Sequence, residues 1–138
     1  MLVLNLVFVL LGNNSFWVQS CEHMIQTATT YNNPKYTNEL LFAIPQGIHL
    51  ANIIMEKETY DVDNINTCAL ILAVAKKESN YNPTAKNGTC LGMYQIKAIT
   101  VKDILRDMSA FPGTKSIKER LYDPLSATVM FVMIMDKF

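Results

Sequence analysis

Apolar residues recur along much of the chain at the three-to-four-residue spacing that is typical of amphipathic helices. In the clearest run, Asp63 or Asn64 can cap a helix whose apolar positions are Ile65, Cys68, Ile71, Leu72, Val74 and Ala75. Asn82-Pro83 ends this run, because the residue before a proline avoids the helical region. The pattern therefore predicts one long helix in the middle of the chain.

Other stretches carry the same spacing more weakly, and together they predict a mainly α fold. Pro45 suits the first turn of a helix, and apolar residues follow it at helical spacing. Thr100 and Asp103 resemble a capping box. The helices expected beside the long one cover residues 18–28, 36–44, 45–60, 92–96 and 100–108.

The C-terminal part has the strongest start signal for a helix. Asp123-Pro124 is a capping residue followed by proline at the first helical position. The helix that follows includes the run ATVMFVMIM, which is apolar on every side. This run is too short to cross a membrane, so we expect a buried core helix.

Composition narrows the class of protein. At 138 residues, half of them hydrophobic, the chain suits one domain that is large enough to bury a core. Twelve Lys and Arg balance twelve Asp and Glu, so a basic nucleic-acid surface is not expected. The three cysteines lack C-x-x-C spacing, Cys68 is expected to be a buried thiol, and Cys21-Glu22-His23 has no second ligand pair. We therefore expect no metal and no other cofactor.

The N-terminal segment admits several interpretations. An apolar run at residues 2–11 is too short to span a bilayer easily, and it lacks the basic region of a secretory signal. The tetrapeptide VQSC at residues 18–21 faintly resembles a lipoprotein cleavage site, with glutamine out of pattern. A packed N-terminal element is an equal alternative. We divide the chain into this segment, residues 1–47, and a domain at residues 48–138.

Glu78 is the candidate acid of the long helix. Ile71, Val74 and Ala75 lie seven, four and three positions before it and share its face. We expect the carboxyl group to extend this apolar stripe, where burial would raise its pKa. A carboxyl group that stays protonated near neutral pH can act as a general acid. The alternative is a frayed last turn with Glu78 in solvent.

The residues from Glu78 onward complete two motifs. Residues 78–85 read E-S-N-Y-N-P-T-A, and residues 92–95 read G-M-Y-Q. Together with Asp123-Pro124, they resemble the E-S-x-aromatic-x-P-x-A, G-L-M-Q and D-P motifs of the lytic murein transglycosylases. That family belongs to the lysozyme-like superfamily, which includes goose-type lysozyme. The resemblance covers about residues 48–135 and implies a lysozyme-like helical fold.

The resemblance also implies roles for single residues. Glu78 would protonate the glycosidic oxygen between N-acetylmuramic acid and N-acetylglucosamine in peptidoglycan glycan strands. It would then accept the proton of the sugar's own 6-hydroxyl group, which closes a 1,6-anhydro ring without a second carboxylate. Gln95 is implied as a substrate contact and Gly92 as a point of close backbone approach. Ser79 would support the glutamate or its loop, with a local helix-end bond as the alternative, and Tyr94 either stacks on a sugar or packs in the core.

Two departures from the family pattern stand out. The loop between the motifs is shorter than usual, with Asn87 where serine is common, and the family's later Y-N-x-G motif does not occur after Gln95. We therefore expect a C-terminally abbreviated domain. Its cleft would be completed by another virion subunit or by a second copy of the chain, packed against the helix at residues 123–138. The alternative is that residues before Ile48 cover that helix.

The leading hypothesis is a lytic transglycosylase that cuts peptidoglycan, with no nucleic-acid partner and no membrane span. Its expected setting is a phage virion, from which it acts on the wall in the bacterial periplasm during DNA entry. The alternative setting is a secreted or lipid-anchored bacterial enzyme. Alternative functions are a structural virion or assembly protein with a degenerate domain, and a goose-type hydrolase. The carboxylates to consider for a hydrolase are Asp103, Asp107 and Asp123, none of which has diagnostic spacing.

Overall fold

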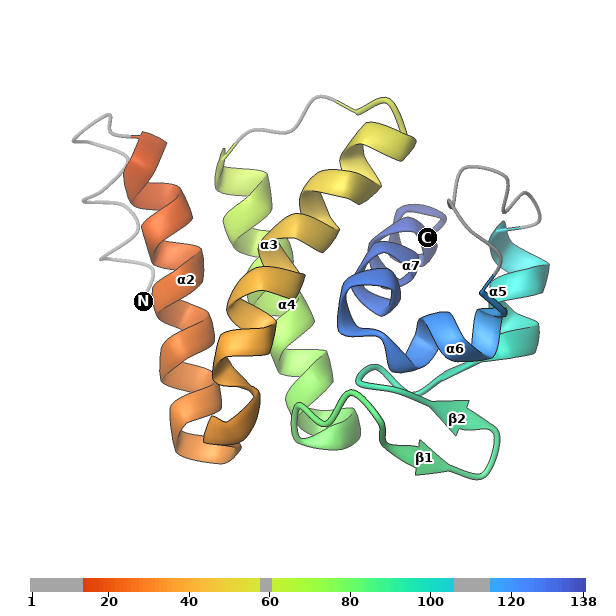
Figure 1. The fold of residues 1–138 in the computed structure, drawn as a ribbon. Helices are drawn as coiled ribbons and strands as arrows, with labels where there is room; N and C mark the ends of the chain where they lie inside the picture. Colours follow the sequence, from red (N-terminus) through yellow and green to blue (C-terminus); the bar gives the residue numbers. More distant parts are fainter. Residues whose placement is uncertain (1–13, 58–60, 106–114) are drawn as a thin grey trace.

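The computed structural model describes residues 14–57, 61–105 and 115–138, without the side chains of residues 14–20 and 61–63 (Figure 1). This part of the chain is mainly helical, as the apolar spacing predicts. The expectations for the apolar run at residues 2–11 fall outside it. The elements in chain order are α2 (Asn14–Asn32), the 3-10 helix η1 (Pro34–Tyr36), α3 (Thr37–Ile54), α4 (Asp61–Ser79), β1 (Lys86–Asn87), β2 (Cys90–Leu91), β3 (Ile96–Lys97), α5 (Ala98–Leu105), α6 (Ile117–Tyr122) and α7 (Pro124–Asp136).

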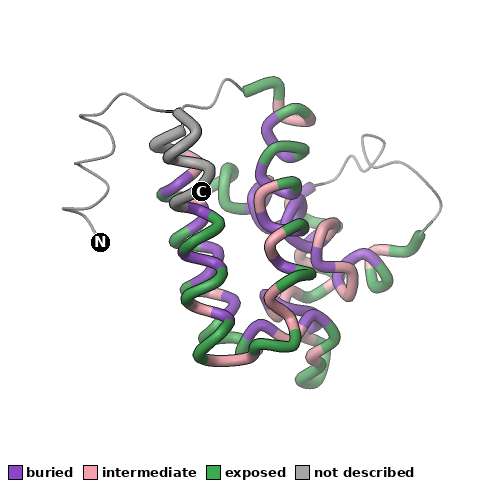
Figure 2. The backbone as a smooth tube through the Cα atoms, turned by 60° about the vertical axis from the view of Figure 1, so that its left-hand side comes forward, coloured by how far each residue is buried: buried purple, intermediate pink, exposed green. Residues whose placement is uncertain are grey.

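Helix α3 lies in the middle of the helical bundle. Helices α2 and α4 pack against each other and both contact α3, whereas α7 packs against another side of α3. Helices α5 and α6 flank α7, and the small sheet lies beside the C-terminal end of α4 (Figure 1). Buried residues concentrate on the sides of the helices that face one another (Figure 2). The arrangement thus forms a single hydrophobic core.

Helix α7 is the buried core helix that its composition predicts. Asp123 caps it by accepting a hydrogen bond from the Ser126 backbone N–H (3.1 Å), and Pro124 occupies its first position. Helix α3 approaches closely at Gly47, where an added Cβ would lie 2.6 Å from the Thr128 Cβ. Helix α7 is therefore covered within the chain, largely by α3. The intrachain alternative thus accounts for the burial of α7, and closure of the cleft by another subunit or a second copy stays a prediction.

Helix α3 corrects the prediction of two short helices that meet at Pro45. It runs without a break from Thr37 to Ile54, with Pro45 inside it. Proline removes one backbone hydrogen bond and disfavours a helix interior by about 3 kcal/mol. Residues on both sides of Pro45 are buried against α2, α4 and α7, and this packing keeps the helix continuous. The division at residues 47 and 48 falls inside α3 and stays a prediction.

The segment after α4 forms a small sheet, and residues 92–96, where a helix was expected, form a turn and the start of β3. Strand β1 pairs with β2, which pairs with β3, and both pairings are antiparallel. Gly88, which has a positive φ of 63°, lies in the turn between β1 and β2. Each strand has two residues, which is too short for the alternation that identifies a strand in a sequence.

Helix α6 was not expected from the apolar spacing, although a local signal precedes it. Ser116 accepts a hydrogen bond from the Glu119 backbone N–H (3.2 Å), and the Glu119 carboxylate bonds back to the Ser116 backbone N–H (3.4 Å). The two bonds form a complete capping box, and the sequence S-I-K-E at residues 116–119 is typical of this motif. The capping box expected at Thr100 is not formed, because α5 already begins at Ala98.

Helix α2 packs along α4 and adds buried residues to the hydrophobic core. Cys21 and Cys68 are both buried at this contact, and the Cys68 thiol lies 3.8 Å from the Cys21 carbonyl oxygen. The neighbouring Cys21 side chain and burial raise the pKa of the Cys68 thiol well above its ordinary value. Cys68 is thus the buried thiol that its position on the apolar face predicts.

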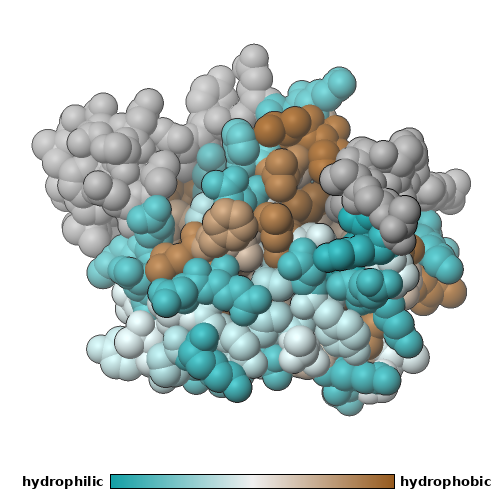
Figure 3. Space-filling view, in the orientation of Figure 1, coloured by the Kyte–Doolittle hydropathy of each residue, from teal (hydrophilic) through white to brown (hydrophobic). Residues whose placement is uncertain are grey.

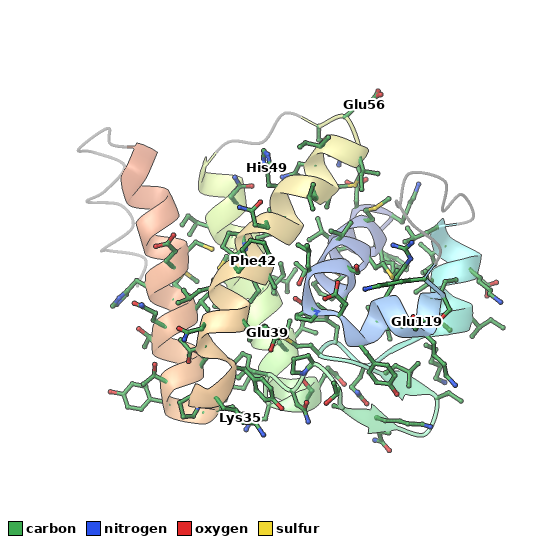
Figure 4. All side chains as sticks on the ribbon, viewed as in Figure 1. Lys35, Glu39, Phe42, His49, Glu56 and Glu119 are labelled. Atoms are coloured by element: carbon green, nitrogen blue, oxygen red, sulfur yellow. The ribbon has the colours of Figure 1, made fainter. Side chains whose placement is uncertain are left out.

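The outer face of α3 carries apolar side chains between polar ones. Phe42 and Ile53 are exposed, and apolar surface gathers over α3 in the space-filling view (Figure 3). Figure 4 labels Phe42 on this face between Glu39 and His49. Among the described residues, no helix is both long enough and apolar enough to cross a membrane.

Candidate active site

Glu78 lies in the last turn of α4, where the long apolar helix meets the loop to the sheet. Ile71 and Ala75, which share its face, are buried as expected. Glu78 itself is exposed, so the expectation that its carboxyl group continues the buried stripe is wrong. The helix ends one residue later, and the neighbouring residues Ser79 and Tyr81 are at least partly buried whereas Glu78 is not. The carboxyl group is therefore accessible to a ligand from solvent.

The backbone directly after α4 takes an unusual path. Asn80 and Tyr81 have positive φ angles of 51° and 66°, a region that residues other than glycine avoid by about 1–2 kcal/mol each. The Asn80 and Tyr81 N–H groups bond to the carbonyl oxygens of Lys76 (3.0 Å) and Ala75 (3.2 Å). The Tyr81 side chain is buried, and this burial raises the pKa of its phenol. Strained backbone of this kind persists where surrounding contacts hold it, as at functional sites.

Residues from the N-terminal part of the chain hold this turn. The Asn33 side-chain amide donates to the Asn80 carbonyl oxygen (3.1 Å), and the Asn80 amide donates to the Asn32 carbonyl oxygen (3.2 Å). The Tyr36 hydroxyl donates to Asn82 Oδ1 (3.1 Å). Sequence reasoning missed these contacts, because no local pattern links residues that lie 46 to 48 positions apart.

Ser79 joins the two motifs. Its hydroxyl oxygen lies 2.7 Å from the Met93 carbonyl oxygen in the second motif and 3.1 Å from the Ala75 carbonyl oxygen in its own helix. The hydroxyl has one proton to donate, and the shorter distance favours the Met93 carbonyl oxygen as its acceptor. Both alternatives for Ser79, support of the loop and a local helix-end bond, are thus present in the geometry.

Gln95 holds the loop between the motifs. Its side-chain amide nitrogen donates to the carbonyl oxygens of Gly92 (2.9 Å) and Ala85 (3.2 Å). Its backbone has a positive φ of 53°. Both amide protons are therefore used inside the protein, and the side chain closes the turn that precedes β3.

Gly92 does allow a close backbone approach, but the approach is made by the protein itself. Its φ is 77°, and an added Cβ would overlap the carbonyl oxygen of Leu121 at the end of α6. Because Gly92 is buried against α6, the structure gives it a packing role in place of the expected substrate contact.

Tyr94 is a core residue. Its ring stacks on Phe131 of α7 with centroids 4.6 Å apart, and its hydroxyl lies 2.7 Å from Thr128 Oγ1. Only 4% of the residue is exposed, and burial raises the pKa of its phenol. With the ring enclosed in this way, the structure contradicts sugar stacking by Tyr94 and supports the core alternative.

The carboxylates considered for a hydrolase do not assemble beside Glu78 in any described contact. Asp123 is occupied as the cap of α7, where it also accepts a bond from the Ser126 hydroxyl (2.8 Å). Asp103 lies on the exposed side of α5, and Asp107 falls outside the described residues. Within the described part of the chain, no three His, Cys, Asp or Glu side chains gather as metal ligands.

A helical bundle with a small sheet beside the end of one helix, and with two motifs joined at that end, defines a lysozyme-like domain. The model of the Transglycosylase SLT domain matches residues 52–138, which is more than half of the chain, so the protein belongs to this family. Membership of this family assigns the chain to the peptidoglycan-cleaving transglycosylases as a general class. No curated protein and no solved structure matches it. Helix α2 and most of α3 precede the matched residues.

Proposed function

We propose that the protein is a lytic transglycosylase in which Glu78 is the only catalytic carboxylate. One observation supports this role above the others. Glu78 is an exposed acid at the point where the first motif meets the second, and the adjacent Ser79 hydroxyl makes the 2.7 Å contact between them. A catalytic acid needs both access to its ligand and a rigid support, and this position supplies the two together.

The proposed reaction uses Glu78 twice. In the first step its carboxyl group donates a proton to the glycosidic oxygen between N-acetylmuramic acid and N-acetylglucosamine, and the bond to that oxygen breaks. In the second step the carboxylate accepts the proton of the 6-hydroxyl group of the muramic acid residue. The 6-oxygen bonds to the anomeric carbon, and the acid is restored. The reaction consumes no water, which agrees with a site supported by one carboxylate.

Two other predicted site residues, Ser79 and Gln95, support the loops around Glu78. Ser79 and Gln95 fix the two loops through bonds to backbone carbonyl oxygens, so their contribution is the shape of the site. Gln95 Oε1 remains the atom through which this side chain is proposed to contact a saccharide, since its nitrogen is committed to the loop.

Glu78→Gln tests the proposal directly. The amide keeps the shape of the carboxyl group but cannot donate the proton, so cleavage of purified peptidoglycan should fall about 10²–10⁴-fold. Glu39→Gln, at an exposed position on α3, is the matched control and should leave activity unchanged. Full activity of a folded Glu78→Gln protein would remove the assignment. Absence of turnover in the folded wild-type protein would favour the structural virion or assembly role.

The product separates the transglycosylase from a goose-type hydrolase. Mass spectrometry of digested glycan should find a 1,6-anhydromuramic end and no new reducing end. A product heavier by one water would show that a water molecule attacks, and a second acid would then have to be found.

The biological setting we propose is a phage virion, from which the enzyme opens the cell wall locally during DNA entry. The alternative is a secreted or lipid-anchored bacterial enzyme. Antibody detection in purified phage particles, compared with periplasmic and membrane fractions of uninfected cells, decides between them. The protein should be found in the particles.

A further inference from the structure

A hollow of about 490 Å³ lies between the small sheet, the start of α5 and α6. Three lysines from three different elements line it: Lys86 of β1, Lys97 of β3 and Lys118 of α6. Leu91 and Ile99 contribute apolar surface, and Ile99 is 64% exposed. Neither Glu78 nor Gln95 lines this hollow, so it is distinct from the candidate active site.

The charge of the hollow is one-sided. No carboxylate lines it, and none of the three lysines forms an ion pair within the described part of the chain. Glu119, next to Lys118, is bound to Ser116 in the capping box, and Asp103 lies one turn beyond Ile99 on α5 without reaching the lining. Cations gathered in this way repel one another, and an anionic ligand relieves the repulsion.

We propose that this hollow binds the peptide stem of the peptidoglycan strand through the carboxylates of the stem. The inference rests on the proposed function, because the stem is attached to the muramic acid at which Glu78 is proposed to act. A peptide stem combines carboxylates with aliphatic side chains, which suits three ammonium groups beside Leu91 and Ile99. The hairpin that carries Lys86 also follows directly from the Glu78 loop, and Gln95 binds the two together through the Ala85 carbonyl oxygen.

The test measures binding and cleavage separately. A free acidic stem tetrapeptide is titrated into the protein, and backbone NMR signals of Gly88 and Ala98 should shift. The triple variant Lys86→Gln, Lys97→Gln, Lys118→Gln should bind about tenfold more weakly, because exposed charge pairs each contribute little. The triple Arg variant keeps the charge and should keep binding, and binding should weaken as salt rises.

Two results would overturn the stem site. One is equal binding of the tetrapeptide after its carboxylates are amidated. The other is an equal loss of cleavage by the triple Gln variant on normal glycan and on glycan stripped of its stems. If the wild-type protein binds the tetrapeptide but cleaves nothing, the proposed function fails while the stem site stands.

A second inference comes from the hydrogen bonds between residues 32–36 and residues 80–82. The donors and acceptors are Asn32, Asn33 and Tyr36 on one side and Asn80 and Asn82 on the other, at 3.1 to 3.2 Å. Asn82 Oδ1 also accepts from the Thr84 backbone N–H (3.0 Å), so the same oxygen shapes the start of the loop. The N-terminal contributors lie outside the residues matched by the family model.

The geometry points to Asn33 and Tyr36 as positioning residues for Glu78. They act on the two-residue turn of positive φ that follows Glu78 and Ser79, where the backbone needs outside support. The bonds are few and mostly at the surface, so their effect on global stability is small, whereas a small displacement of an acid strongly affects catalysis. Residues 32–36, which precede the matched domain, are thus part of the active-site support.

Tyr36→Phe and Asn33→Ala test this role against two matched controls, Tyr31→Phe and Asn38→Ala. Tyr31 is 86% exposed and Asn38 is an exposed residue of α3. Each test variant should lower kcat about three- to tenfold with KM nearly unchanged, in line with the loss of one hydrogen bond. Hydrogen exchange of the Asn80 and Tyr81 amides, which are bonded in the native turn, should accelerate by a similar factor.

Unchanged exchange at Asn80 and Tyr81 would overturn the positioning role whatever the activity. A loss of kcat that merely follows a fall in Tm would do so as well, because that pattern indicates general destabilisation. Faster exchange in a protein without measurable turnover would support the contacts of Asn33 and Tyr36 with the turn and reject the proposed catalysis.

Discussion

The contact between α3 and α7 and the segment from Ser79 to Lys97 are held together by different forces. The helix pair is built from apolar side chains that are buried on both partners, with Met130 fully enclosed. The segment depends on polar bonds such as those of Ser79 and Gln95, and on three residues other than glycine with positive φ. Burial of apolar side chains in the helix pair stabilises the fold, whereas the strained backbone of the segment lowers stability and gives the candidate site its shape.

Each region also depends on one glycine, and the two glycines meet different obstacles. Gly47 faces the Thr128 side chain, which can shift with the helix that carries it. Gly92 faces the Leu121 backbone carbonyl at the end of α6 and has a φ of 77°. The Thr128 side chain can move when α3 and α7 shift slightly, whereas the backbone carbonyl of Leu121 in α6 cannot move away so easily. Substitutions at these positions therefore test the comparison most strongly.

Gly92→Ala should have the largest effect on stability. The added methyl group meets the Leu121 carbonyl and a backbone region that alanine avoids, so we expect a loss of about 3–5 kcal/mol in the free energy of unfolding. Gly88→Ala is the matched control, because Gly88 has a φ of 63° but nothing within 4 Å of an added Cβ. It should lose about 1 kcal/mol. Equal losses in urea denaturation would mean that the Leu121 contact carries no weight.

Gly47→Ala should destabilise the helix pair by about 1–3 kcal/mol, because the added Cβ lies 2.6 Å from two atoms of Thr128. In an open helix the same substitution would stabilise by about 0.5–1 kcal/mol, so the sign alone is informative. Gln46→Ala, one residue earlier on the exposed side of α3, should change little. A stabilised Gly47→Ala protein would show that α3 and α7 separate easily, which would contradict the view that their close packing stabilises the fold.

Tyr94→Phe tests a link between the two regions, since Tyr94 belongs to the segment but packs on Phe131 and Thr128 of α7. The ring stack remains and one buried hydrogen bond is lost, so we expect a loss of about 1 kcal/mol in the free energy of unfolding. Thr128 keeps its bond to the Pro124 carbonyl oxygen (2.7 Å), which limits the damage. The KM for peptidoglycan cleavage should not change, because the buried Tyr94 side chain is not available to a sugar.

The same variant has a pH signature. Burial raises the pKa of both Tyr81 and Tyr94 in the folded protein. Above about pH 10, an unfolded tyrosine loses its proton while the buried one keeps it, so stability falls as pH rises beyond that point. Tyr94→Phe should make this alkaline decline shallower, as followed by denaturation at several pH values together with tyrosinate absorbance. An unchanged slope would mean that Tyr94 ionises in the folded protein.

The contrast between the apolar helix pair and the polar segment also explains which parts of the fold the sequence predicts. Helices α4 and α7 follow from apolar spacing and from Asp123-Pro124, because a helix signal is repeated over many residues. Pro45 misled the prediction, since packing on both sides of α3 outweighs a local preference. The two-residue strands carry too little pattern to be found, whereas the capping box at Ser116 and Glu119 was a readable signal for α6.

The candidate site divides in the same way. The two motifs identify Glu78, and periodicity gives the face on which it lies. Periodicity cannot say whether another element covers that face, so it left a buried and a solvent-exposed Glu78 as alternatives, and the structure shows the exposed one. The bonds from Asn33 and Tyr36 to the turn after Glu78 join residues far apart in the chain, and their chemistry is ordinary for any exposed asparagine or tyrosine.

Lys57 and Asp136 should give the smallest effect, although they bridge the end of α3 and the end of α7. Their ion pair lies at the edge of the helix pair, with side chains 48% and 29% exposed. Solvent and salt screen such a pair, so Lys57→Ala should cost at most about 0.5 kcal/mol, and less at high salt. A double-mutant cycle with Asp136→Asn isolates the interaction from other effects of each change. A coupling as large as the Gly47 effect would mean that polar bonds also hold the helix pair, and the two regions would then differ in geometry alone.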